Sequence, residues 1–195
     1  ALGWGCTGLT IFHGLLYWKW YLRPETLAAG EWFEQGFATY RLQGEQGWQW
    51  TDPYYYEQPT ALPFLSSFYP PHRVSAWMTR SWSLNQAWRA YLATMAAHSL
   101  LCGIGVYMLI LPETAPWPAG FVAATLSTTG YGFKPNASIL YPAAWAPLPV
   151  LTALQHSGWL CGISLGMSLL AGYWPISLPL IGLTWCCWLW PSLFA

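Results

Sequence analysis

Two residues in the longest apolar part of the chain have side chains that carry or transfer charge. Arg89 and His98 both lie in "WRAYLATMAAHSLL", residues 88–101. Arginine does not lose its proton in proteins, so Arg89 would be a permanent positive charge. Histidine titrates near neutral pH and can pass protons on. Ionisable residues inside a membrane helix are costly and usually functional. The alternatives are that Arg89 snorkels to the membrane interface and that His98 is an ordinary core histidine.

The spacing of these two residues places them on opposite faces of one helix. At roughly 100° and 1.5 Å per residue, nine residues correspond to about two and a half turns and about 14 Å along the axis. The two side chains therefore cannot bind one metal ion or act as a direct pair. They can act at successive points of a path for charge.

A second apolar run carries two adjacent polar residues, Gln155 and His156, within residues 149–174. Such residues either form hydrogen bonds between membrane helices or make a short polar track. If the two apolar runs form neighbouring antiparallel helices, Arg89 and Gln155 can approach each other within the membrane.

The composition favours an all-α integral membrane protein. The chain has 195 residues, of which 55% are hydrophobic and 7% are charged, whereas about 25% are charged in a typical soluble domain. Of the fourteen charged residues, twelve lie at or before Arg89, and only Glu113 and Lys134 follow. The net charge is zero and there is no basic run, so nucleic-acid binding has no electrostatic support. The five cysteines form no CxxC pattern, so we expect neither a metal nor a cofactor.

The elements that would position these residues form a long tilted helix hairpin, over about 82–111 and 149–174. The first helix lacks proline until Pro112. At about 45 Å it exceeds the roughly 30 Å of a perpendicular span, so it must tilt, curve or begin outside the hydrocarbon. The connection 112–148 is rich in proline, with a short helix expected around 119–127.

The flanking segments complete a division into three parts. The N-terminal part, 1–81, is aromatic-rich, and we expect interfacial helices and ordered loops there. In it, 5–22 is barely long enough to span a membrane or lies at the interface, and 26–43 fits an amphipathic helix. The hairpin occupies 82–174. The last part, 175–195, is apolar and compatible with a C-terminal helix. Arginines shortly before the long helix place its start on the positive-inside face.

The long apolar run resembles a helix of a known family. "SLNQAWRAYLATMAAHSLL", residues 83–101, is similar to the arginine-bearing helix of the a subunit of rotary F-type ATP synthases, in which a histidine follows nine residues later. Gln155 stands in a context similar to that of the family's glutamine opposite the arginine. The chain departs from the pattern at Ala93, where the family has asparagine. It departs again at Leu148, where the family has a titratable residue, and in its long connection. A divergent mitochondrial member fits these features best.

The resemblance implies a non-catalytic, proton-translocating stator subunit in the Fo region, multi-pass in the mitochondrial inner membrane. Its partners would be the c-ring proteolipids, other Fo and peripheral-stalk subunits, and lipids. Arg89 would be the essential charge between two half-channels, with Gln155 packed near it. His98 would relay protons in the lumenal half-channel. Glu113 or His156 would replace the titratable group missing at Leu148.

A second resemblance lies in the connection. "TLSTTGYGFKP", residues 125–135, resembles a potassium-channel filter, in which backbone carbonyls replace the hydration shell of the ion. Thr129 and Phe133 depart from that pattern, and a glycine-containing turn explains the stretch equally. The alternatives to the proton-translocating function are therefore a potassium-selective pore subunit and a structural accessory subunit of a membrane respiratory complex.

Overall fold

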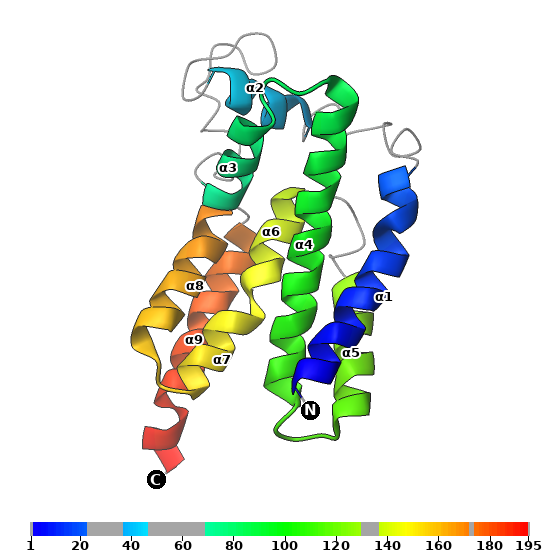
Figure 1. Cartoon of the computed structure of the whole chain (residues 1–195). Helices are drawn as coiled ribbons and strands as arrows, with labels where there is room; N and C mark the ends of the chain where they lie inside the picture. The colour runs from blue at the N-terminus through cyan, green and yellow to red at the C-terminus, as the bar shows by residue number, and fades with distance from the viewer. Residues whose placement is uncertain (1, 23–36, 47–68, 130–136, 172–173, 195) are drawn as a thin grey trace.

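The computed structural model describes residues 2–22, 37–46, 69–129, 137–171 and 174–194. Within these ranges the chain forms nine helices and no strand, which confirms the predicted all-α class (Figure 1). The helices are α1 (Leu2–Leu22), α2 (Ala38–Gln46), α3 (Pro70–Met78), α4 (Leu84–Ile110), α5 (Pro116–Thr129), α6 (Ala137–Trp145), α7 (Pro147–Leu154), α8 (Gly158–Leu170) and α9 (Trp174–Phe194).

The long helix predicted over 82–111 is confirmed as α4. It begins at a capping box: the Gln86 backbone N–H donates to the Ser83 side chain, and the Ser83 backbone N–H donates to the Gln86 side chain over 3.2 Å. It ends just before Pro112, which cannot continue a helix. Among the described residues, α4 is the one helix long and apolar enough to cross a membrane.

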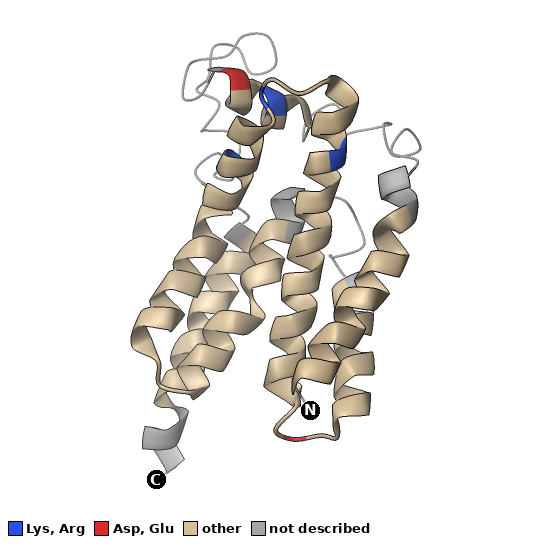
Figure 2. Ribbon diagram, viewed as in Figure 1, with Lys and Arg blue, Asp and Glu red and all other residues tan. Residues whose placement is uncertain are grey.

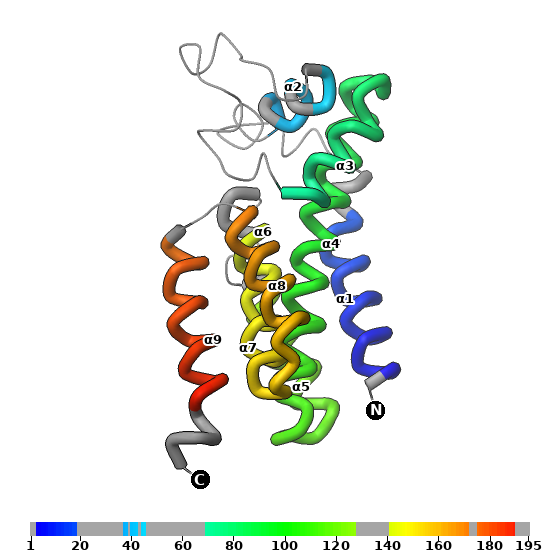
Figure 3. Tube along the Cα trace, turned by 90° about the vertical axis from the view of Figure 1, so that its left-hand side faces the viewer, coloured from blue at the N-terminus to red at the C-terminus, as the bar shows by residue number. Residues whose placement is uncertain are grey.

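Helix α4 runs through the middle of the bundle. Helices α1 and α5 pack along one side of it, while α6 and α7 pack on the other, with α3 beside its first turns. Figure 3 shows α9 and α1 at opposite sides of the molecule with α4 between them. The buried hydrophobic residues accordingly form one cluster on each side of α4.

The prediction of a single helix over 149–174 is wrong, because the chain reverses direction within this segment. Helix α7 ends at Leu154 and α8 begins at Gly158, so the two form a short hairpin. The Ser157 N–H donates to the Thr152 carbonyl over 2.9 Å, and the His156 N–H donates to the Ala153 carbonyl over 3.0 Å. These two bonds make a Schellman motif. His156 occupies its left-handed position, with φ of 53°.

Where it is described, the segment 112–148 is largely helical. Helix α5 contains the short helix expected around 119–127, and α6 follows it. Residues 125–129 form the last turn of α5, so they do not present the extended row of carbonyls that an ion filter needs. The remainder of the filter-like stretch, 130–135, lies outside the described residues.

The terminal segments are also helical where described. Helix α1 includes the apolar run 5–22 and packs lengthwise on α4 and α5. Helix α9 continues through Pro179 and forms the expected C-terminal helix. Most of the amphipathic helix predicted over 26–43 falls outside the described residues, and α2 covers only its end.

Charge is concentrated at one end of the bundle. In Figure 2 the described arginines lie toward the end where α2 is found, which we call the arginine end. They are Arg41, Arg73, Arg80 and Arg89. Glu113 lies in the turn between α4 and α5, at the opposite end. Between these two ends, Figure 2 shows no Asp, Glu, Lys or Arg among the residues that it colours by type.

Candidate functional site

Arg89 occupies the second turn of α4, close to the arginine end. Its side chain is half-buried. Ala93 and Ala97 follow at intervals of four residues, and both are exposed. Residues four apart lie on one helix face, so Arg89 stands at the end of an open face of α4 lined by small side chains.

His98 lies on the other face of α4 and is buried, with 6% of its surface exposed. Its Nδ1 lies 2.6 Å from the Thr94 carbonyl oxygen. A carbonyl only accepts hydrogen bonds, so Nδ1 carries the hydrogen, and Nε2 of the neutral ring accepts from the Tyr69 hydroxyl. The Trp145 indole N–H in turn donates to the Tyr69 oxygen over 2.5 Å. Both nitrogens of the histidine thus have defined partners.

A second histidine belongs to the same buried cluster. His72 of α3 lies with its Nδ1 3.3 Å from the Tyr141 hydroxyl, and the Tyr141 ring lies 4.4 Å from the His98 ring. Tyr91 of α4 adds a fifth side chain, whose hydroxyl is buried without a hydrogen-bond partner. We call Tyr69, His72, Tyr91, His98 and Tyr141 the His–Tyr cluster. It joins α3, α4 and α6.

The environment of His72 disfavours its charged form. The side chain is 4% exposed and belongs to α3, outside the one described helix that is long enough to span a membrane. Burial, followed by smaller contributions from His98 and Arg73, lowers the pKa of His72 from 6.5 to about 3. His72 is therefore neutral at physiological pH, with one ring nitrogen able to donate and the other able to accept.

A row of hydroxyl groups lies between this cluster and the arginine end. The Tyr40 hydroxyl lies 2.8 Å from Ser75 Oγ and 2.9 Å from Thr79 Oγ1. Ser75 Oγ lies 3.0 Å from Thr94 Oγ1, one helical turn before His98. The Thr79 carbonyl accepts from the Arg41 guanidinium over 3.2 Å. We call Tyr40, Ser75, Thr79 and Thr94 the hydroxyl row.

A separate polar network lies on the opposite side of α4. The Tyr17 hydroxyl donates to Ser99 Oγ over 2.9 Å, and Ser99 donates to the Ser127 carbonyl over 2.9 Å. Ser127 Oγ lies 3.1 Å from His13 Nε2, while His13 Nδ1 donates to the Leu9 carbonyl over 2.8 Å. This network ties α1 and α5 to α4.

The other residues predicted for the site lie elsewhere. Gln155 and His156 are exposed and form the turn between α7 and α8, at the end of the bundle opposite the arginines (Figure 1). Glu113 is exposed at that same end. The structure therefore does not bring Gln155 to Arg89, and neither Glu113 nor His156 lies beside His98. Gln155 and His156 are displaced because the chain reverses between α7 and α8, and Glu113 is displaced because it stands in the turn between α4 and α5.

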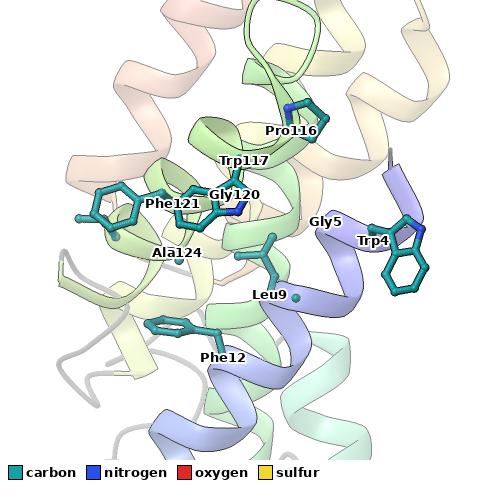
Figure 4. Close-up of a pocket in the computed structure, with 11 residues that line it drawn as sticks. Trp4, Gly5, Leu9, Phe12, Pro116, Trp117, Gly120, Phe121 and Ala124 are labelled. Atoms are coloured by element: carbon teal, nitrogen blue, oxygen red, sulfur yellow. The ribbon is translucent and has the colours of Figure 1, made fainter.

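An apolar pocket of about 460 Å³ lies between α1 and α5 (Figure 4). Leu9 and Phe12 line it from α1, and Trp117 and Phe121 line it from α5. None of its lining residues is titratable. The pocket can make apolar contacts but supplies no group for proton transfer.

Sequence reasoning missed the tyrosines and His72. Tyr69 and His72 stand in the N-terminal part, where we expected interfacial helices and ordered loops, and Tyr141 stands in the connection 112–148. The signal available in the sequence was that Tyr69, His72 and Tyr141 each stand next to a proline, in a chain poor in other polar groups. Only the packing of α3 and α6 on α4 brings them together.

The described residues contain no group of three or more His, Cys, Asp or Glu side chains that could hold a metal ion. The chemistry that the described cluster offers is exchange of protons between neutral hydroxyl and imidazole groups. Comparison of the chain with protein-family models, curated proteins and solved structures gives no match.

Proposed function

We propose that this chain is a proton-translocating membrane subunit with the role of the a subunit of a rotary ATP synthase. In this role Arg89 is the fixed charge that faces a carboxylate on a moving partner helix. His98, on the other face of α4, passes protons. The observation that carries the proposal is the open face of α4, on which Arg89 stands in line with Ala93 and Ala97.

The surface of the bundle supports a membrane environment. Large apolar side chains are widely exposed along its helices, among them Leu15 at 70%, Phe121 at 65% and Trp159 at 70%. Soluble monomers rarely expose extensive contiguous apolar patches. The described arginines gather at one end, as expected for the positive-inside face. Lipid and neighbouring subunits would cover this surface.

The open face of α4 suits a closely packed helix that carries one carboxylate. Small residues such as Ala93 and Ala97 let two helix backbones approach in a membrane, where tight packing drives association. A carboxylate on that helix would meet the Arg89 guanidinium in a low-dielectric setting, where opposite charges attract strongly. The partner that fits is a ring of small proteolipids, each with one membrane carboxylate.

The mechanism follows from the cost of an unpaired charge in lipid. A carboxylate can move through the hydrocarbon only when protonated, because its ionised form is poorly solvated there. Opposite Arg89 the ionised form is stabilised, so the proton is released on one side of the arginine and another is taken up on the other side. Arginine keeps its own proton, so Arg89 blocks direct leakage between the two sides.

The test is to replace Arg89 with alanine in the native membrane complex. We expect Arg89→Ala to abolish proton-coupled ATP synthesis and ATP-driven proton pumping while the complex still assembles beside its proteolipid ring. Both activities are measured in inverted vesicles, and assembly is measured by copurification of the ring.

Arg80→Ala is the matched control, because Arg80 lies at the same end, exposed, with its guanidinium 4.7 Å from the centre of the Trp77 ring. It should retain coupling. If Arg89→Ala retains full coupling in an assembled complex, or no proteolipid ring copurifies, the proposal is wrong. The chain is then better explained as a structural accessory subunit.

A further inference from the structure

The apolar pocket between α1 and α5 lies toward the end of the bundle opposite the arginines. We propose that it binds one acyl chain of a membrane phospholipid whose headgroup is a choline, with the trimethylammonium group beside Glu113 and the exposed indole of Trp117. This inference goes beyond the proposed function. It uses the membrane setting of the bundle, but it depends neither on proton translocation nor on Arg89.

The pocket exists because each of its two walls carries a glycine on the face that lines it. On α1, Gly8 stands four residues after Trp4. On α5, Gly120 stands four residues after Pro116. Residues four apart lie on one helix face. A Cβ added at Gly8 or at Gly120 would meet nothing within 4 Å, so the space over both glycines is open to a ligand.

The lining of the pocket matches a hydrocarbon chain. Its volume of about 460 Å³ falls within the range of ordinary ligand pockets. Leu9 points from α1 toward α5 (Figure 4) and is 3% exposed, so it forms the base. Thr125 is the one lining residue with a hydroxyl group, and no lining side chain carries a charge. A charged ligand would therefore find no counter-charge inside, whereas an acyl chain needs none.

The pocket opens on the outer surface of the bundle. Among its lining side chains, Trp4 is 85% exposed, Trp117 is 82% exposed and Phe121 is 65% exposed. They belong to the widely exposed apolar surface that lipid would cover in a membrane. An acyl chain can therefore enter the pocket sideways from the lipid, without passing through the interior of the bundle.

The two tryptophans place one end of the pocket at the level of lipid headgroups. Trp4 lies in the first turn of α1 and Trp117 in the first turn of α5. Both helices start at the same end of the bundle (Figure 1). Tryptophan is enriched at the membrane–water interface, where its ring contacts the headgroups. A lipid with its chain in the pocket would therefore have its headgroup near these starts.

The charge at this end selects a cationic group in the headgroup. Glu113 is exposed and stands three residues before Pro116, which begins α5. Figure 2 shows no Lys or Arg at this end among the residues that it colours by type. A carboxylate attracts an ammonium group, and tryptophan faces bind quaternary ammonium groups. Lipid tails are as apolar as the pocket, so the headgroup decides which phospholipid binds.

The experiment measures lipid binding to the full chain in detergent by native mass spectrometry. The probes are phosphatidylcholine and phosphatidylglycerol with identical palmitoyl and oleoyl chains, so that only the headgroup differs. We expect one phosphatidylcholine to bind per chain, about tenfold more tightly than phosphatidylglycerol. Gly120→Leu, whose side chain enters the pocket, should weaken phosphatidylcholine binding about tenfold. Gly8→Leu makes the same test from α1, should Gly120→Leu fail to fold.

Gly14→Leu is the matched control. Gly14 is an exposed glycine of α1 that also has nothing within 4 Å of an added Cβ, but it does not line the pocket. It should leave binding of both lipids unchanged. Glu113→Gln should reduce the preference for phosphatidylcholine to about twofold or less, because the attraction of the carboxylate for the ammonium group is lost.

Three results would overturn the inference. The first is wild-type affinity for phosphatidylcholine in folded Gly120→Leu or Gly8→Leu. The second is equal affinity of the wild type for the two lipids. The third is a change from dimer to monomer in Gly120→Leu with lipid binding kept, which would place a second copy of the chain on the pocket. None of these results bears on Arg89→Ala, so the proposed function stands or fails separately.

Discussion

At the scale of single residues, the buried interior of the bundle holds neutral polar groups. His98 has both ring nitrogens bonded, and His72 is buried among tyrosine rings. Unpaired polar groups in such an interior cost about 1–3 kcal/mol each. The hydrogen bonds among these side chains offset that cost while keeping every group uncharged.

The neutrality of His72 makes the fold sensitive to acid. In the folded protein its pKa is about 3, against 6.5 when it is exposed. Between these values the unfolded chain binds a proton that the folded chain does not bind, so stability is lost as the pH falls through that window. We expect the thermal unfolding midpoint of the purified chain in detergent to fall between about pH 7 and pH 4, as followed by circular dichroism.

His72→Gln should lose part of that pH dependence, because glutamine does not titrate. The comparison is between the two slopes of unfolding midpoint against pH, so a uniform loss of stability in the variant does not affect it. Equal slopes for the wild type and His72→Gln would show that His72 does not cause the acid sensitivity.

At the scale of elements, local signals decide where helices end. The capping pair Ser83 and Gln86 fixes the start of α4, and Pro112 fixes its end, so this helix is predictable from the sequence. The sequence did not predict the hairpin of α7 and α8, because the turn contains neither a proline nor a charged residue and apolar residues lie on both sides of it. The Ser157–Gly158 pair, a common turn dipeptide, was the signal available.

The left-handed residue of that turn predicts a stabilising substitution. His156 has φ of 53°, a conformation that costs an L-residue roughly 1–2 kcal/mol but costs glycine little. We expect His156→Gly to raise the free energy of unfolding by about 1 kcal/mol. The gain is reduced by loss of the ring contact with Trp188, whose centre lies 5.5 Å away. Denaturant unfolding measures the change.

His156→Ala separates the two effects, because alanine loses the ring contact and keeps the backbone strain. It should be no more stable than the wild type. If the glycine and alanine variants are equally stable, the left-handed backbone at this position carries no strain.

At the scale of the whole molecule, two neighbouring helices, α5 and α7, come very close to α4 at two of its glycines. A Cβ added to Gly105 would lie 2.9 Å from Pro147 Cβ of α7, and one added to Gly103 would lie 3.0 Å from Ser127 Oγ of α5. The two glycines thus set how tightly the flanking helices pack. This part of the architecture could not be predicted from the sequence, because a helical glycine shows neither which face it lies on nor which helix comes near.

Gly105→Ala and Gly162→Ala should change stability in opposite directions. At Gly105 the added methyl group meets Pro147, a rigid ring, and overpacking costs about 1–3 kcal/mol. At Gly162, in α8, nothing lies within 4 Å of the added Cβ, so alanine should gain up to about 1 kcal/mol from its helix propensity. Thermal unfolding of both variants in the same detergent measures the difference. A gain of stability at Gly105 would contradict the close packing of α7 on α4.

The two polar networks meet α4 at consecutive residues. His98 bonds toward Tyr69 on one side, and Ser99 bonds toward Tyr17 and the Ser127 carbonyl on the other. A helix held by neighbouring residues on different faces cannot turn about its axis or slide along it without breaking both sets of bonds. Helix α4 is therefore held against rotation and sliding at the level of His98 and Ser99. A sideways force at Arg89 would therefore bend the helix between Arg89 and His98, while the part of α4 beyond Ser99 would keep its position.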